Sequence, residues 1–193
     1  MPASRAARDA SDREGEKRLM KLDLDEVKTL LRRTPVALDA LLRGLPEPWM
    51  HENEGPDTWS SFDVVGHLVE AEETNWIPRA RHLIAHGESA AFPPFDRFGF
   101  AEKAKGRSMA EILDAFSEAR ARSLRHLDEL RLSPGDLARR GRHPDFGPVT
   151  LGQLFSTWTI HDLNHLGQIV DVLARQHTEA VGPWRAFLGI LDK

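Results

Sequence analysis

The sequence predicts an all-α protein, a four-helix bundle with a short extra helix near its C-terminus. Three observations support this fold class. Four long segments repeat apolar residues every three or four positions, no segment sustains the two-residue alternation of a strand, and connections rich in proline and glycine separate the four segments. Amphipathic helices joined in this way bury their apolar stripes against one another.

A single domain is expected over residues 21–193. A chain of 193 residues can bury roughly two thirds of the surface that it exposes when unfolded, so no disulfide is required to hold the fold together. Residues 1–20 mix five basic and four acidic side chains without an apolar core. We expect them to form a disordered tail rather than a signal peptide.

The first two helices are expected over residues 23–43 and 60–86. Gly44 and Gly87 mark their ends, and either Ser60 or Ser61 can cap the start of the second helix. Proline lacks the amide hydrogen that a helix interior needs. The first helix should therefore kink or divide at Pro35, and the second should bend at Pro78.

The third and fourth helices are expected over residues 108–131 and 150–176. Each begins with the residue pattern of a capping box, in which two side chains satisfy each other's free backbone amides. The pairs are Ser108 with Glu111 and Thr150 with Gln153. A short amphipathic helix should follow Gly182.

The three connections, 44–59, 88–107 and 132–149, are expected to be loops. The second is unusually aromatic, with four phenylalanines between residues 92 and 100, so it is a candidate lid over a site or a candidate dimer contact. The third carries the basic residues Arg139, Arg140 and Arg142. Recognition of an anion is one interpretation of this stretch, but a solvated loop is favoured.

Composition excludes several function classes. The chain has no cysteine and nine histidines, which rules out a disulfide framework, a thiolate zinc finger, an iron–sulfur cluster and a cysteine nucleophile. A net charge of −4 is unfavourable for nucleic-acid binding, and no apolar run approaches the roughly 18 residues of a membrane span. We expect a cytoplasmic protein that acts on a small molecule, without nucleic acid or membrane as partner.

Two histidines in the fourth helix are candidate metal ligands. His161 and His165 are four residues apart and share the apolar stripe, a spacing by which two imidazoles on one helix can hold one ion. The alternative is a pair of hydrogen-bonded core histidines placed by chance. A second pair at the same spacing, His82 and His86, ends the second helix beside arginines and is interpreted as favourable charge at a helix C-terminus.

His67 is the candidate third ligand. It occupies the inward face of the second helix, from which it could meet His161 and His165 across the bundle. Three neutral imidazoles without a thiolate suit zinc, nickel or iron and leave one position open for water or substrate.

Two segments resemble the DinB-like superfamily, which includes the YfiT-type metalloenzymes. They are W-x-x-x-D-V-x-x-H-L at residues 59–68 and T-L-G-Q-L-F-x-x-W-x-x-H-D-x-x-H-L-x-Q-I at residues 150–169, within a resemblance that covers about 22–175. The resemblance implies a four-helix bundle, a homodimer, and a metal triad of His67, His161 and His165. It also implies an enzyme that uses a low-molecular-weight thiol such as bacillithiol or mycothiol.

The function expected from these observations is that of a metal-dependent enzyme, with a thiol-dependent S-transferase preferred. A divalent zinc or nickel ion, or iron, would lower the pKa of a bound thiol, and the thiol must come from outside because the chain has no cysteine. The alternatives are a hydrolase that activates a metal-bound water and a non-catalytic bundle in which the ion only stabilises the fold.

Five further residues have candidate roles. Glu70 follows His67 by three positions and could accept a hydrogen bond from a ligand or act as a general base, although a solvated or salt-bridged side chain is favoured. Gln168 could orient His165 or substrate, or bond across the core. Trp158 is interpreted as core packing, as is Trp59, and Asp162 as an exposed helix residue.

Overall fold

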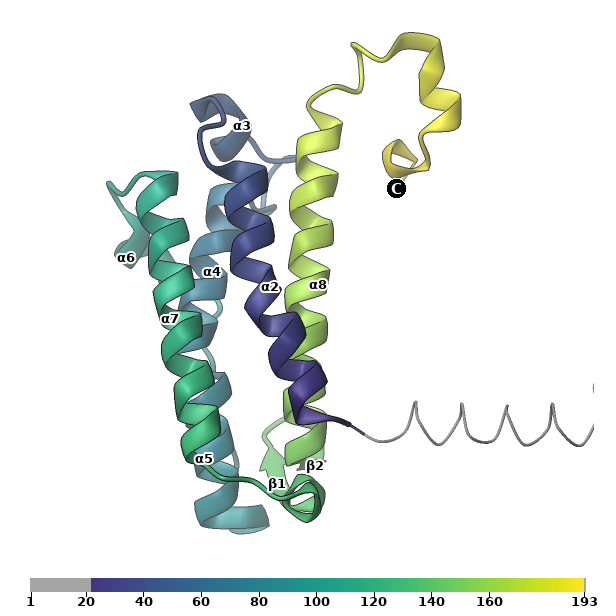
Figure 1. Ribbon diagram of the computed structural model, residues 1–193. Helices are drawn as coiled ribbons and strands as arrows, with labels where there is room; N and C mark the ends of the chain where they lie inside the picture. Colours follow the sequence, from purple (N-terminus) through teal and green to yellow (C-terminus); the bar gives the residue numbers. More distant parts are fainter. Residues whose placement is uncertain (1–21, 193) are drawn as a thin grey trace, which may run out of the picture.

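The computed structural model describes residues 22–192, so the tail expected over 1–20 lies outside the described residues. Four long helical segments form a bundle (Figure 1). They are α2 (Leu24–Leu42), α4 (Ser61–Thr74) continued by α5 (Trp76–His86), α7 (Met109–Glu129) and α8 (Leu151–Arg175). Helices α2 and α4 each contact both α7 and α8. The predicted four-helix bundle is confirmed.

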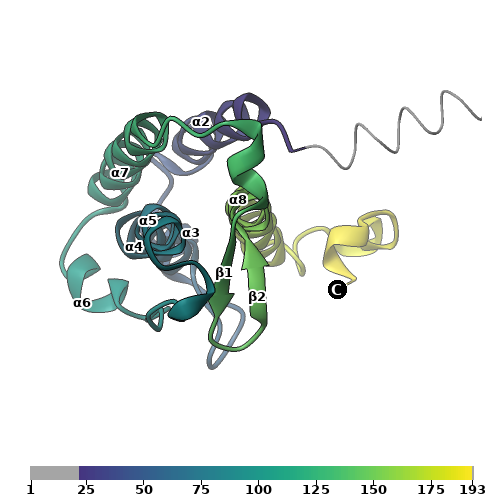
Figure 2. The same ribbon diagram turned by 90° about the horizontal axis from the view of Figure 1, so that it is seen from below.

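The helices do not simply alternate in direction. In Figure 1, α2 and α8 run upwards, whereas α4 with α5 and α7 run downwards. The connection between α5 and α7 therefore returns along the length of the bundle and includes η1 (Gly87–Ser89) and α6 (Phe100–Ala104). Figure 2, the view from below, shows α6 on the outside of the ring of helices, beside α4. This return segment is the aromatic connection noted in the sequence.

Side-chain caps fix where the long helices begin. Both predicted capping boxes are present. The N-cap of α4 is Ser60, one of the two serines expected there, and it forms a further capping box with Asp63 that was not predicted. A cap of this kind stabilises a helix by about 0.5–2 kcal/mol, because it satisfies amides that have no partner within the helix.

The two proline predictions have different outcomes. Pro35 lies inside α2, which is one continuous helix, so the predicted division there is wrong. The expected bend in the second helix lies at Asn75, three residues before Pro78, where the backbone adopts φ −106° and ψ −67°. A proline ring clashes with the carbonyl four residues earlier, so the backbone must change direction ahead of the proline rather than at it.

The expected loops contain short elements. Residues 44–59 include α3 (Glu47–His51), and residues 132–149 include η2 (Pro134–Ala138) and the antiparallel hairpin of β1 (Arg140–His143) and β2 (Gly147–Thr150). The expectation of no strand was wrong because four residues a strand are too few to show alternation.

The C-terminal segment does not form the short α-helix that the sequence predicted. It forms two 3₁₀ turns, η3 (Gly182–Phe187) and η4 (Gly189–Leu191), in place of one α-helix. The segment projects beyond the upper end of α8 in Figure 1, and Trp184 and Phe187 are 70% and 85% exposed. No helix in the described part of the chain is both long enough and apolar enough to cross a membrane.

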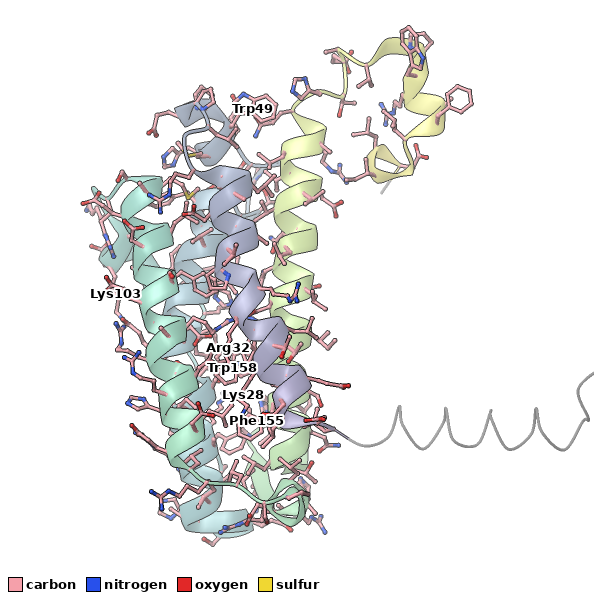
Figure 3. The ribbon with its side chains drawn as sticks, in the orientation of Figure 1. Lys28, Arg32, Trp49, Lys103, Phe155 and Trp158 are labelled. Carbon is pink, nitrogen blue, oxygen red and sulfur yellow. The ribbon has the colours of Figure 1, made fainter. Side chains whose placement is uncertain are left out.

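The interior holds an ionic cluster. Figure 3 places Phe155 and Trp158 between the helices, and Trp158 donates a hydrogen bond of 2.7 Å to Glu72. Arg120, only 1% exposed, bonds Glu72 at 2.8 Å and both oxygens of Asp162 at 2.6 and 2.9 Å. Burial raises the pKa of the Glu72 carboxyl, against the pull of Arg120. Asp162, interpreted as exposed, is buried because its partner comes from another helix.

Candidate metal centre

Three histidines from two helices converge at one point of the interior. His67 comes from α4, and His161 and His165 come from successive turns of α8. The Nε2 atom of His161 lies 3.2 Å from Nε2 of His67 and 3.2 Å from Nε2 of His165. Of the described residues, these three form the group whose ligand atoms could hold a metal ion, and we call them the triad.

Hydrogen bonds on the far side of two rings set their tautomers. Nδ1 of His67 lies 3.1 Å from the carbonyl oxygen of Arg97, and Nδ1 of His165 lies 2.9 Å from Oε1 of Gln168. A carbonyl oxygen only accepts, so each Nδ1 carries the proton and donates it. The Nε2 lone pairs of both rings therefore point at His161.

The three facing Nε2 atoms have too few protons to satisfy one another by hydrogen bonds, and this favours a bound cation. A neutral His161 has at most one Nε2 proton to share between the two lone pairs that face it, so at least one buried nitrogen stays unsatisfied. Its own Nδ1 also finds no hydrogen-bond partner among the described residues. Unpaired buried polar atoms are costly, and a shared ion would satisfy all three Nε2 atoms.

The spacing of the nitrogens also fits an ion. A tetrahedral centre with metal–nitrogen bonds of about 2.0–2.1 Å holds its ligands about 3.3–3.4 Å apart, close to the two separations of 3.2 Å. Three imidazoles are ligands for zinc, nickel or iron, and they leave one coordination position for another molecule.

Burial keeps the triad neutral. Desolvation lowers the pKa of His67 to about 4 and that of His161 to about 3, with neighbouring histidines adding to each shift. Burial also lowers the pKa of His165. Neutral imidazole is the form that binds a metal, so the site can receive an ion at neutral pH without first losing protons.

Aromatic side chains wall the triad. The ring centroid of Trp59 lies 4.6 Å from that of His67 and 6.1 Å from that of His165. Phe95 and Phe100, from the return segment, meet His67 at 5.7 and 6.4 Å. The segment can approach because residue 66 is glycine, since a Cβ there would lie 2.7 Å from the Phe100 ring. The return segment thus covers the triad.

A cavity of about 390 Å³ opens beside the triad, and we call it the triad cavity. Its wall is mainly apolar and aromatic, and it includes two arginines but no Asp or Glu of the described residues. The residues that line it outside the triad include Trp59, Asn75, Trp76, Arg79, Phe92, Phe95, Arg97, His143 and Phe146.

The sequence model that matches the chain is that of the DinB superfamily, over residues 30–169. The chain belongs to the DinB superfamily. The match contains the whole triad, so the family suggested by the two sequence segments is confirmed.

Known proteins give a consistent comparison. A curated relative from Oceanobacillus iheyensis, provisionally named a metal-dependent hydrolase, is 26% identical over 161 residues, which are 80% of this chain and 84% of the relative. The structure of YfiT from Bacillus subtilis, provisionally described as a metal-dependent hydrolase with an unusual four-helix bundle topology, superposes with a TM-score of 0.66 at 21% identity. That match covers 79% of this chain and 86% of YfiT.

A second solved structure, described as a four-helix bundle protein, gives a TM-score of 0.51 at 23% identity and covers 76% and 98% of the two chains. Both solved structures support the bundle fold. Two of these proteins are described as metal-dependent, and in this chain the three-histidine group is the set of described residues that could hold a metal ion.

The candidate supporting residues Gln168 and Glu70 have different surroundings in the structure. Gln168 lies against His165, as one of its two expected roles requires. Glu70 was expected to be solvated or salt-bridged. It is buried, and its carboxylate bonds Lys103 at 2.5 Å, so the salt-bridged alternative holds. A role for either residue in catalysis stays a prediction.

Two other sequence features lie elsewhere. His82 points its Nε2 atom at the carbonyl of Ala90, 3.2 Å away. Of the basic residues expected in a solvated loop, Arg140 and Arg142 lie in β1, and Arg139 directly precedes it. Arg140 pairs with Glu88, and Arg139 donates to the carbonyl of Ile84. Several cavity residues were missed by sequence reasoning, among them Asn75 and Arg79. The break ahead of Pro78 was the available sign that this region departs from a plain helix.

Proposed function

We propose that this DinB-superfamily chain is a metal-dependent hydrolase whose divalent ion is held by the Nε2 atoms of His67, His161 and His165. The observation that carries the proposal is the convergence of two buried imidazoles, His67 and His165, on the half-buried His161, with too few protons on the facing Nε2 atoms to satisfy all three. Hydrolysis is preferred because two relatives are provisionally described as metal-dependent hydrolases. Zinc or nickel is the expected ion, with iron as a third candidate.

A divalent ion in this place supplies a Lewis acid that polarises a substrate oxygen and lowers the pKa of a water or thiol ligand. The protein residues have other tasks. Gln168 and the carbonyl of Arg97 hold two imidazoles in the ligating tautomer, while Trp59 and the return segment limit access of bulk water. The triad cavity receives the substrate beside the open coordination position.

A thiol-dependent S-transferase is the second candidate, and one observation favours it. The lining of the triad cavity offers no carboxylate that could take a proton from water. A thiol ionises more readily than water, with a pKa of about 8.5, and so depends less on a general base. The thiol would be an external one of the bacillithiol or mycothiol type.

We also propose that the protein is a homodimer, and light scattering, which measures the molar mass in solution, tests this.

Metal analysis tests the proposal first. We expect one divalent ion per chain in the purified or reconstituted protein and its loss in His161→Ala. The control His51→Ala removes an exposed histidine outside the triad and should keep the ion. Activity is then measured on a panel of esters and amides without thiol, and on an electrophile such as chlorodinitrobenzene with added thiol.

The outcomes separate the candidates. Turnover that needs metal but no thiol supports the hydrolase, and turnover that needs both supports the transferase. A reconstituted wild type without metal overturns both. Bound metal that raises the melting temperature, without any turnover on either panel, favours the non-catalytic bundle.

A further inference from the structure

The geometry points to an anionic substrate: we propose that the triad cavity binds a small apolar molecule that ends in an oxyanion, with Arg79 as the charge partner and Asn75 and His143 as hydrogen-bond partners. This inference deepens the proposed function and rests on it only for the place where the substrate reacts. It assigns a substrate class and three binding residues that do not belong to the triad.

Arg79 is a half-buried cation without an acidic partner. Its guanidinium lies 5.3 Å from the centroid of the Phe92 ring, and no carboxylate of residues 22–192 lies within salt-bridge distance. Burial lowers the pKa of this guanidinium, an effect that the charge of Asp145 opposes only in part. A charge held in this way gains from an anion that shares its desolvated surroundings.

Asn75 supplies a buried amide with spare bonding capacity. It is 5% exposed, it lines the triad cavity, and its Oδ1 has no hydrogen-bond partner in the described part of the chain. The break between α4 and α5 puts it one helical turn before Arg79, whose backbone amide donates to the Asn75 carbonyl at 2.9 Å. Because the amide group can turn over, it can offer its N–H to an oxyanion.

His143 adds a donor from the hairpin. The backbone amides of Asp145 and Phe146 donate to its Nδ1 at 3.1 and 3.4 Å, so its proton sits on Nε2. Burial and the nearby Arg79 lower the pKa of His143 and favour this neutral form. Its ring centroid is 6.1 Å from that of Phe92, the ring beneath the Arg79 guanidinium. The two donors thus adjoin the same phenylalanine.

The rest of the cavity suits an apolar body. Trp76, Phe92, Phe95 and Phe146 contribute aromatic wall, and Trp76 meets His161 of the triad at 5.1 Å between ring centroids. A volume of about 390 Å³ lies at the small end of the range for ligand sites. A molecule with its oxyanion at Arg79 can therefore extend along these rings towards the triad.

Calorimetry on the full chain tests this inference. The probes are phenylacetate and phenyl phosphate, which carry the two common oxyanions, and phenylacetamide as their neutral counterpart. Each is titrated into zinc-loaded protein and into protein treated with chelator. We expect at least one anion to bind tenfold or more tightly than the amide in both forms, and the tighter anion identifies the terminal group.

Variants locate the binding. Arg79→Gln should reduce anion affinity to the level of the amide, whereas Arg81→Gln, an exposed arginine on the same helix, should leave it unchanged. Asn75→Asp keeps the size of the side chain and places a negative charge in the cavity, so it should also abolish anion binding. Circular dichroism confirms that each variant is folded.

The result is separable from the fate of the proposed function. If no zinc binds but anion binding still depends on Arg79, the inference stands and the hydrolase proposal fails. If zinc binds normally while the anions and the amide bind equally, or while Arg79→Gln binds anions like the wild type, the inference is overturned. Anion binding that needs zinc but not Arg79 overturns it as well, because the anion is then a metal ligand.

Discussion

Arg120 donates a hydrogen bond of 2.6 Å to the carbonyl oxygen of Leu31, the residue four positions before Pro35. In a regular helix, the amide of residue 35 would serve that carbonyl, but proline has no amide hydrogen. The guanidinium on α7 thus fills a gap in the hydrogen bonding of α2. This contact explains why α2 continues through Pro35 as one helix.

Removal of Arg120 should be strongly destabilising. Arg120→Met leaves Glu72 and Asp162 buried without their cation and should lower the free energy of unfolding by about 3–5 kcal/mol. Urea denaturation followed by circular dichroism measures the change. Arg122→Met, an exposed position on the same helix, should stay within about 0.5 kcal/mol of the wild type. Equal effects at the two positions would contradict the assigned role of the cluster.

Pro35 and Arg120 should be energetically coupled. Pro35→Ala restores an amide for the Leu31 carbonyl, which Arg120 already serves in the wild type but which has no donor in Arg120→Met. The proline replacement should therefore stabilise the Arg120→Met background more than the wild type, by about 1–3 kcal/mol. A double-mutant cycle in urea gives this coupling, and additive effects would argue against it.

Zinc affinity should vary little with pH above about 6. The pKa of His67 is lowered to about 4 and that of His161 to about 3, and burial lowers the pKa of His165 as well, so protons compete with zinc at lower pH than they would at exposed imidazoles. Exposed imidazoles, with a pKa of about 6.5, would lose affinity already below pH 6.5. Calorimetric titration of zinc from pH 8 to pH 5 distinguishes the two profiles, and a steep loss between pH 7 and 6 would refute this prediction.

Gln168 should strengthen metal binding through His165. Gln168→Leu removes the acceptor for Nδ1–H and should weaken zinc binding by about 10–100-fold. Gln168→Glu keeps an acceptor in place and should retain tight binding. Asn164→Leu, exposed on the same helix, is the matched control. Competition with a chromophoric chelator measures the zinc affinity of the wild type and the three variants. An unchanged affinity in Gln168→Leu would mean that His165 needs no orienting partner.

Two helical glycines differ in the space around them. Replacing Gly66 tests how tightly the return segment packs on α4, and replacing Gly167 is the control. Gly66→Ala introduces a Cβ 2.7 Å from the Phe100 ring and should destabilise the fold by about 1–3 kcal/mol as the segment is pushed off the triad. Gly167→Ala meets nothing within 4 Å and should stabilise α8 by about 0.5–1 kcal/mol. Thermal unfolding measures whether each replacement raises or lowers the stability. If Gly66→Ala left the stability unchanged, the return segment would be able to move away from α4 at little cost.

Local sequence patterns predicted the helices, their capping boxes and the triad positions, because each depends on residues within one or two turns of a helix. His67 and its two partners could be paired because both helices present them on inward faces. The hairpin escaped prediction because its strands are four residues long. Division at Pro35 was predicted wrongly because the residue that compensates for the proline lies 89 positions from Leu31.

Partners that are distant in the sequence also explain why Asp162 was misjudged and why the cavity residues were missed. An aspartate between apolar turns resembles a solvated side chain unless its arginine on another helix is known. Arg79 and Asn75 face a cavity whose other wall is the hairpin and the return segment, so their surroundings exist only after the chain has folded. Tertiary neighbours decide the role of such residues, and one sequence does not display them.

The separation of the ligands along the chain has a consequence for biosynthesis. His67 and His161 are 94 residues apart, and α8 is the last long helix to be made. A nascent chain that ends before α8 contains only His67 of the three proposed ligands, and one imidazole is too few to complete the proposed site. If the triad holds the proposed ion, metal uptake follows the docking of α8, and a loaded site would report that the final helix has reached its place.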